Sequence, residues 1–187
     1  MRYVKLLVTG FLGAMLAVPA LAQNDNPPVG ARAVGMGNAS ATVADVWSLT
    51  NNVAGIAELK DPEVGAYAEN RFLMRGFTTV SALGVFGFDK YGTAGLELYR
   101  FGDDLYSEQR IGLGFGHKLG FVSLGLKADL LQVSFQDDGT GESGSRKAVA
   151  LSFGGQATFF RSLLSGLMYT ILTRPKWPTT PTNGFRL

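Results

Sequence analysis

The side chains that catalyse reactions or bind metals are scarce in this sequence. His117 is the only histidine, and the 187 residues include no cysteine. A Ser-His-Asp triad needs a histidine beside a nucleophile, and zinc sites are built mainly from several cysteine and histidine ligands. No serine nucleophile motif accompanies His117, which stands beside a turn at the end of an expected strand. We therefore expect a protein that is not an enzyme.

Three other stretches contain residue types that bind phosphate or calcium, but their spacing does not fit those ligands. The glycines from Gly112 to Gly116 alternate with apolar residues, whereas a dinucleotide-binding loop follows a strand and opens a helix. The glycines from Gly30 to Gly37 lack the Lys-Ser/Thr of a phosphate-binding loop. Asp137, Asp138 and Glu142 do not have the spacing of an EF-hand. We expect no cofactor and no metal site.

Charge is distributed unevenly along the chain. The formal net charge is +2, yet residues 23–160 carry 11 Lys and Arg against 15 Asp and Glu. The excess of positive charge therefore lies at the two ends of the sequence. A nucleic-acid-binding protein needs a basic patch on its folded part. Because the middle of the chain is mildly acidic, we expect no nucleic-acid partner.

The first 22 residues have the pattern of a cleaved signal peptide. Arg2 and Lys5 precede an apolar run from Leu6 to Val18, and Ala20-Leu21-Ala22 matches a cleavage site. That run is too short to span a bilayer, and no later window contains 18 uninterrupted apolar residues. We expect residues 1–22 to be removed and the chain to be exported across the inner membrane.

Between Pro62 and Ala157 the sequence alternates with a period of two, which is typical of β-strands. Residues 61–158 provide about six expected strands, of which the clearest are Phe77–Phe88, Gly92–Phe101, Ile111–Gly116, Val122–Phe135 and Lys147–Phe153. After Leu130 the apolar residues change phase, which predicts a β-bulge.

The strands and their connections together favour an antiparallel outer-membrane barrel. The expected strands are long, and tight turns at 89–92 and 118–120 alternate with longer connections at 102–107 and 137–146. Glu97, Lys127 and Asp129 fall opposite the apolar face, which is the lumen side of a barrel. A water-soluble β-sandwich also alternates in this way, so it stays an alternative.

Aromatic residues gather at the expected strand ends, namely Phe86, Phe88, Tyr91, Tyr99, Phe101, Tyr106 and Phe121. Membrane barrels have aromatic girdles at the two lipid–water interfaces, where such ends would lie. General β-propensity explains the same residues equally well. The aromatic pattern is compatible with a membrane barrel but does not require one.

Residues 23–60, between the leader and the strands, contain a glycine-rich motif followed by an amphipathic stretch. Val43, Val46, Trp47, Thr50 and Ala54 fit one face of a helix. We expect a short helical hatch that packs into the barrel mouth. Its motif residues, in chain order, are Gly30, Ala31, Arg32, Gly35, Met36, Gly37, Asp45, Trp47, Asn51, Asn52, Ala54 and Gly55.

The order of these pieces resembles the PorV/PorQ family of outer-membrane barrels, which is similar in turn to the FadL-type hydrocarbon transporters. GARAVGMG, AD-x-W and NN-x-AGI follow each other directly after the leader and before glycine-rich strands. The resemblance covers about residues 28–157. Val53 stands where the family has a proline in an Asn-Pro-Ala-Gly-like element.

The resemblance implies a non-enzymatic protein in the outer membrane of a Gram-negative bacterium, in contact with its lipid. PorV-like members are accessory barrels of type IX protein secretion, and their partners are proteins of the secretion apparatus. FadL-like members are channels for hydrophobic small molecules. A soluble periplasmic β-domain that binds a partner is the alternative from a different class.

Residues 159–187 do not read as barrel. Arg161 to Leu172 is nearly all apolar, and Pro175, Pro178 and Pro181 follow within seven residues. Either a C-terminal helix ends at the prolines, or the reading frame slips near Phe160, since codons for 168–175 in another frame give a strand-like string. A single-chain barrel needs at least about eight strands, so we expect an all-β, antiparallel transmembrane barrel that is partial in this chain, with an N-terminal helical hatch.

Overall fold

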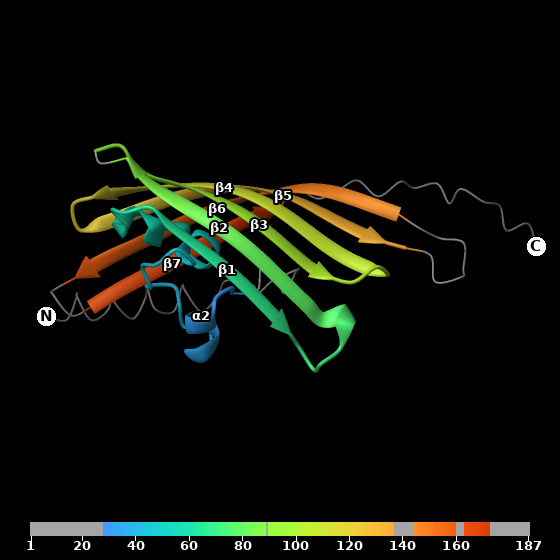
Figure 1. The fold of residues 1–187 in the computed structure, drawn as a ribbon. Helices are drawn as coiled ribbons and strands as arrows, with labels where there is room; N and C mark the ends of the chain where they lie inside the picture. The colour runs from blue at the N-terminus through green and yellow to red at the C-terminus, as the bar shows by residue number, and fades with distance from the viewer. Residues whose placement is uncertain (1–27, 89, 137–143, 160–162, 173–187) are drawn as a thin grey trace, which may run out of the picture.

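The chain forms one antiparallel β-sheet with a small helical layer on one side (Figure 1). The computed structural model describes residues 28–88, 90–136, 144–159 and 163–172. Neighbouring strands pair in sequence order from β1 to β7. Their bounds are β1 Glu63–Asn70, β2 Thr78–Phe88, β3 Gly92–Gly102, β4 Tyr106–Leu119, β5 Val122–Phe135, β6 Gly144–Phe159 and β7 Leu163–Leu172. The prediction of an all-β, antiparallel fold is confirmed.

The sheet has seven strands rather than about six, because residues after 159 contribute β7. This strand pairs with β6 over ten positions, from Ala150↔Leu172 to Phe159↔Leu163. The alternative prediction of a C-terminal helix is therefore wrong for residues 163–172. Periodicity alone does not distinguish a short apolar strand from a helix. The reading-frame hypothesis concerns the coding DNA and stays a prediction.

The predicted bulge after Leu130 is wrong. The pairing of β4 with β5 is unbroken from Tyr106↔Phe135 to Leu119↔Val122, and the ladder of β5 with β6 is equally regular. The apolar residues change phase because, beyond Leu130, polar residues occupy the convex positions of β5 and apolar residues occupy the concave positions. Alternation places Gln132 on the convex face, after a run of apolar residues that ends at Leu130.

The two edge strands, β1 and β7, each have one neighbour, so the sheet is not closed into a barrel within the described residues. The sequence predicts a barrel that is only partial in this chain, and the described strands form an open sheet. No helix among the described residues is long and apolar enough to cross a membrane. Residues 1–22, the loop with Asp137, Asp138 and Glu142, and the prolines after 172 lie outside the described residues.

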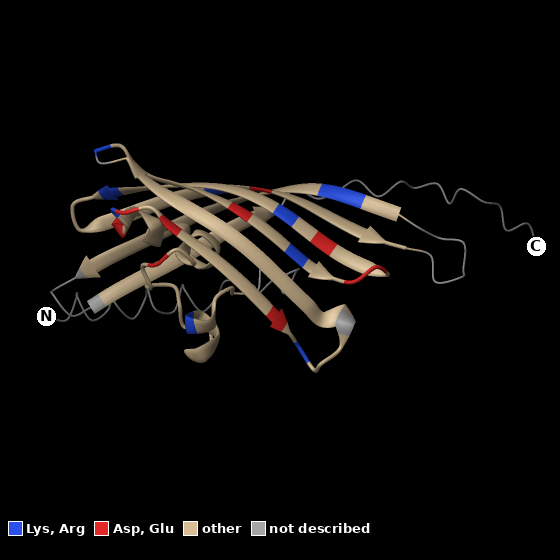
Figure 2. Ribbon diagram, viewed as in Figure 1, with Lys and Arg blue, Asp and Glu red and all other residues tan. Residues whose placement is uncertain are grey.

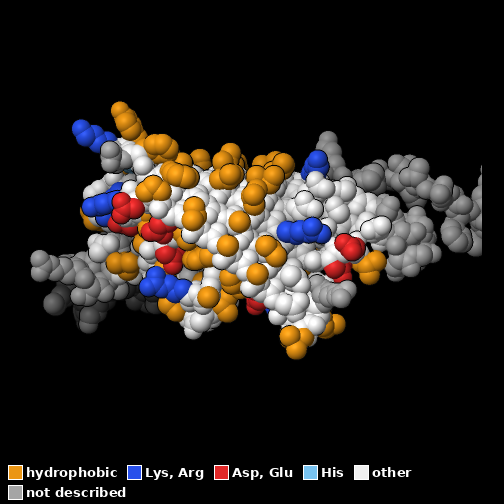
Figure 3. Space-filling model, in the orientation of Figure 1, with side chains coloured by type: hydrophobic (Ala, Val, Ile, Leu, Met, Phe, Trp, Pro, Cys, Tyr) orange, Lys and Arg blue, Asp and Glu red, His pale blue; other side chains and the backbone are white. Residues whose placement is uncertain are grey.

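The two faces of the sheet differ in polarity. The convex face exposes large apolar side chains, including Leu96, Leu98, Ile111, Leu113, Phe115, Leu124, Leu126, Leu130, Val149, Leu151 and Phe153. Figure 3 shows such side chains spread over the visible sheet face, with charged groups toward its two ends. The concave face instead buries polar residues such as Thr93, Glu97, Ser123, Lys127 and Ser152. This distribution is the reverse of a half-buried water-soluble sheet.

The hatch segment covers the concave face. It contains α2 (Ala31–Gly35), α3 (Ser48–Asn51) and the 3-10 helix η1 (Val53–Glu58), while a second 3-10 turn, η2 (Arg75–Phe77), precedes β2. The hydrophobic core lies between hatch and sheet and consists of Val46, Leu49, Val53, Ile56, Leu83 and Val85. The hatch is therefore the second layer of the fold.

The single helical face predicted from Val43 to Ala54 is wrong. Asn52 adopts an extended conformation (φ −159°, ψ 100°), and its side-chain oxygen accepts a hydrogen bond from the Ala54 amide. Asparagine favours such capping positions because its short side chain competes with helical backbone bonds. Val46 and Leu49 before the break and Val53 and Ile56 after it all pack in the core against the sheet.

Candidate functional site

The spaced glycines of the sheet provide the surface on which the hatch lies. A Cβ atom at Gly114 would be 2.4 Å from a methyl group of Leu49. At Gly116 it would be 2.8 Å from Ile56, and at Gly125 it would be 2.5 Å from the Val53 backbone. The glycines that alternate along β4 and β5 therefore allow the hatch to pack closely against the sheet.

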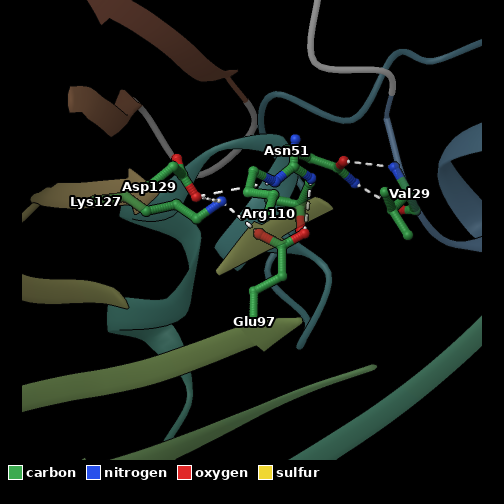
Figure 4. Close-up of polar contacts among 7 residues, drawn as sticks. Val29, Asn51, Glu97, Arg110, Lys127 and Asp129 are labelled. Carbon is green, nitrogen blue, oxygen red and sulfur yellow. Dashed lines mark hydrogen bonds and ion pairs between the residues drawn. The ribbon is translucent and has the colours of Figure 1, made fainter. Parts of the chain in front are cut away.

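Four charged side chains form a buried cluster beside the hatch (Figure 4). Glu97 of β3 pairs with Arg110 of β4 at 2.8 Å and with Lys127 of β5. Lys127 also lies 2.9 Å from Asp129, and Arg110 lies 3.9 Å from the same carboxylate. The cluster has two positive and two negative groups, so its formal charges cancel. Buried charges of this kind need such pairing.

The hatch is bonded directly to this charged cluster. The Thr50 hydroxyl of α3 donates a hydrogen bond to Glu97 Oε1 at 2.8 Å, and both residues are buried. Gly112 makes room for the cluster, since a Cβ atom there would lie 2.3 Å from Asp129 Oδ1 and 2.7 Å from Lys127 Cε. The cluster is therefore a junction between three strands and the hatch.

Tyr99 also belongs to the concave side. It is buried, and the guanidinium carbon of Arg110 lies 4.3 Å from the centre of its ring, in a cation–π contact. Assigning it to an outward aromatic girdle is wrong, because its place in β3 alternates with the convex residues Leu98 and Arg100. Phe86 and Phe88 do lie on the convex face and are exposed.

Two asparagines of the motif fix the course of the hatch. The backbone amide of Val29 donates a hydrogen bond to Asn51 Oδ1, and Asn51 Nδ2 donates one to the carbonyl of Val29, both at 3.0 Å. The Asn52 amide donates to the carbonyl of Ala41 and, at 3.3 Å, to that of Gly155 in β6. Asn52 is fully buried, and these two bonds join it to another part of the hatch and to the sheet.

Other motif residues hold the hatch in its conformation through close packing, a hydrogen bond and an ion pair. Gly30 has φ +104°, and a Cβ atom there would lie 2.7 Å from the Trp47 ring. Asp45 accepts a hydrogen bond from the Trp47 amide at 2.9 Å and forms a 3.5 Å ion pair with Arg32. A Cβ atom at Gly55 would lie 2.6 Å from the Val43 carbonyl oxygen, while Ala54 is fully buried.

Part of the motif lies away from the charged cluster. Ala31, Gly35, Met36 and Gly37 are exposed, and a Cβ atom at Gly35 would meet nothing within 4 Å. Gly37 has φ +63° in the turn that follows α2. His117 lies in β4 on the convex side, at the end near the tight turn. These residues do not converge on a common site.

The end of the hatch is held by a second polar contact with the wall. Glu58 of η1 forms an ion pair with Lys118 of β4 and accepts a hydrogen bond from the Ser123 hydroxyl of β5. Burial raises the pKa of Glu58, but the hydrogen bonds of Lys118 and Ser123 outweigh this and hold the pKa below its usual value. Glu58 is therefore a carboxylate in the folded protein at neutral pH.

Comparisons with protein-family models, with curated proteins and with solved structures give no match. The PorV/PorQ resemblance therefore depends on the hatch residues and on the order of the elements. None of the motif residues is arranged with a nucleophile or a second titratable group in the manner of a catalytic centre within the described residues. The motif instead shapes the hatch and attaches it to the sheet.

Sequence reasoning placed Glu97, Lys127 and Asp129 on the lumen side, but it did not bring them together as one cluster. Arg110 and Thr50 were not recognised as its partners. Alternation along β4 could have identified Arg110 as a partner, because Arg110 and Gly112 lie two residues apart and therefore face the same side of the sheet. The register Gly112↔Asp129 then places the acidic residue directly opposite the glycine.

Proposed function

We propose that the chain forms part of the wall and the hatch of an outer-membrane barrel of the PorV/PorQ type. Such a protein acts as an accessory to type IX protein secretion and catalyses no reaction. The observation that carries the proposal is the polarity of the sheet, with an exposed apolar convex face and a polar concave face under the hatch. In a membrane barrel, an exposed apolar outer face of this kind contacts the acyl chains of the lipids.

The apolar convex face is organised in rows that cross the strands. Leu98, Ile111, Leu130 and Val149 are register partners, and the next row contains Leu96, Leu113, Ala128 and Leu151. Leu113 is 64% exposed, and its neighbours in these rows are also accessible. A soluble monomer rarely exposes a continuous apolar patch of this kind. This band argues against the soluble periplasmic domain.

The concave side favours the accessory role over a channel for hydrophobic molecules. The hatch lies on a part of the sheet that contains the buried ion pairs of Glu97 and the buried polar residues Ser123, Ser152 and Gln156. These charges are already paired and buried beneath the hatch, so this part of the concave face presents ionic and polar groups rather than an apolar surface that would bind such a solute. The hatch contacts with this wall suit a plug that stays in place.

A membrane location places a demand on the two free edges. The outer backbone N–H and C=O groups of β1 and β7 pair with no strand that the structure describes, and unpaired groups of this kind would cost several kcal/mol each in hydrocarbon. The proposal therefore requires a partner strand at each edge when the protein is in the membrane.

Fractionation tests the membrane proposal. The full chain with its leader is expressed in a Gram-negative host, and the outer membrane is washed with alkaline carbonate. We expect the protein to stay with the membrane and to need detergent for release. A leader-free chain that remains a compact monomer in plain buffer would overturn the proposal.

Partner analysis then separates the two membrane roles. Cross-linking in the envelope of the source bacterium, followed by affinity purification, should recover secretion-apparatus proteins. Uptake of a labelled fatty acid by cells that express the protein should equal that of cells without it. The opposite pair of results would favour the FadL-like channel.

A further inference from the structure

The apolar band of the convex face ends at a polar row that crosses four strands. Arg100 pairs in register with Gln109, Gln109 with Gln132, and Gln132 with Lys147. Each member lies two residues along its strand from the apolar row of Leu98, Ile111, Leu130 and Val149, a step of about 7 Å. We call these four residues, Arg100, Gln109, Gln132 and Lys147, the boundary row.

A second polar row lies beyond the boundary row. It contains Gly102, Ser107, Ser134 and Ser145, which are again register partners. The Ser134 hydroxyl donates to that of Ser145 at 3.2 Å, and the Gln132 amide donates to Ser134 at 3.4 Å. The convex face therefore changes from apolar to polar at one level in all four strands. Such a sharp level matches the edge of a hydrocarbon layer.

The two faces also differ in the sign of their charges. The acidic residues of the seven strands, Glu63, Glu69, Glu97, Glu108 and Asp129, all alternate onto the concave side. On the convex side the charged strand residues are Arg100 and Lys147, both in the boundary row and both exposed. Neither forms an ion pair with another described residue.

One acidic residue that the structure describes at the same end, Asp103, lies in the loop after β3. Asp103 there accepts hydrogen bonds from the backbone amides of Leu105 and Tyr106 at 3.0 and 3.1 Å, so its carboxylate is engaged within the loop. Figure 2 shows the charged residues of the strands against long uncharged stretches. The boundary row thus combines two cations that have no ion-pair partner in the described part of the chain with two amide donors, a set that suits an anionic oxygen ligand.

We propose that the boundary row binds the phosphate groups of anionic lipid headgroups in the outer membrane. This inference rests on the proposed membrane function, because the row meets headgroups only if the apolar band meets acyl chains. The Arg100 guanidinium donates two parallel hydrogen bonds to phosphate oxygens, and the Lys147 ammonium supplies a point charge. The side-chain amides of Gln109 and Gln132, which lie between these two cations, donate further hydrogen bonds to the phosphate. Acyl chains of the same lipids then lie on Leu98, Ile111 and Leu130.

Lipid selectivity in reconstituted vesicles tests the inference. The full chain is reconstituted in phosphatidylcholine vesicles, and its association with spin-labelled phosphatidic acid is compared with that of spin-labelled phosphatidylcholine. We expect the wild type to prefer the anionic lipid. Each of Arg100→Gln and Lys147→Gln should weaken this preference by about fivefold at low salt, since a basic residue at a membrane surface contributes to that extent.

Matched variants keep the test independent of folding. Arg32→Gln makes the same change in the hatch, away from the convex face, and should leave the preference unchanged. The double variant Arg100→Glu/Lys147→Glu should disfavour the anionic lipid, and high salt should remove the wild-type preference. Insertion of every variant is checked by resistance to carbonate extraction.

The outcomes separate the two proposals. A wild type that inserts but shows no anionic preference, or whose preference survives in both boundary-row variants, overturns the inference while the membrane proposal stands. Equal losses in Arg32→Gln and Arg100→Gln overturn it as well, because the effect would then follow net charge. A wild type that does not enter vesicles overturns the proposed function itself.

Discussion

Thr50 of the hatch donates a hydrogen bond of 2.8 Å to Glu97 of the sheet, and neither residue is accessible to solvent. The bond links the N-terminal segment to a strand 47 residues later in the chain. It is the contact through which the hatch reaches the buried ionic cluster, and it gives the first prediction.

Replacing Thr50 with valine keeps the shape of the side chain but removes the donor to Glu97. We expect a loss of about 1.5–3 kcal/mol in stability, the range for a hydrogen bond to a charged group. Trp47 fluorescence in a Trp177→Phe background follows the hatch during denaturant unfolding in detergent. Thr50→Ser keeps the hydroxyl and should recover most of the loss. An unchanged midpoint for Thr50→Val would contradict the role of this bond.

Adding a methyl group at Gly112 should disturb the ionic cluster, because the new Cβ would lie 2.3 Å from Asp129 Oδ1. We expect Gly112→Ala to destabilise the fold by about 1–3 kcal/mol, as overpacking does. Gly35→Ala is the matched control, since a Cβ atom there has open space. Thermal unfolding followed by circular dichroism measures both, and equal midpoints would refute the close packing at Gly112.

Removing one cation from the cluster should cost more than removing a pair. Lys127→Met leaves the carboxylates of Glu97 and Asp129 with one cation, and we expect a loss of about 3–5 kcal/mol. The double variant Lys127→Met/Glu97→Gln restores charge balance and should be more stable than Lys127→Met. Denaturant unfolding of the four proteins closes a double-mutant cycle. Additive effects would show that the two residues do not interact.

The contact of Glu58 with Lys118 and Ser123 should make hatch stability depend on pH. Its pKa is lowered in the folded state, so the carboxylate contributes stability above its ordinary pKa near 4.5, and this contribution is lost as the pH falls through the folded pKa. In Glu58→Gln this part of the acid dependence should be absent. Trp47 fluorescence between neutral and acidic pH compares the two proteins, and parallel curves would contradict the prediction.

A positive charge should have different effects at two convex positions of β4. Leu113→Arg puts the charge within the apolar band, where a membrane barrel loses about 2–4 kcal/mol, whereas Gln109→Arg lies in the boundary row and should cost about 0–1 kcal/mol. Reversible folding into lipid vesicles measures both variants. If Leu113 faced water instead, the two substitutions would be equally mild, and equal values would argue against the membrane proposal.

The period-two pattern was sufficient to predict strands β2 to β6 and their faces. It assigned Ile111, Leu113 and Phe115 to one face and the intervening glycines to the other, as the structure confirms. It also located the tight turn between Leu119 and Val122. These features are local, because alternation along an extended chain directly decides which side chain points to which face.

The long-range arrangement depended on tertiary contacts. Local pattern predicted one helical face for the hatch, but Asn52 breaks it to bond with Gly155, 103 residues later. The apolar run 163–172 became β7 because β6 offered a strand edge with which to pair. The capping bond from Ala54 to Asn52 is local, but the Gly155 carbonyl and the free edge of β6 are partners that only the folded sheet supplies.

The sequence by itself therefore determined a β-rich chain with an apolar and a polar side and a glycine-rich segment before the strands. The tertiary structure decided that Glu97, Arg110, Lys127 and Asp129 meet as one buried group and that Thr50 binds to it. Register between strands sets such meetings, and register depends on the turns that join the strands and on which face of the sheet is buried, not on alternation within one strand.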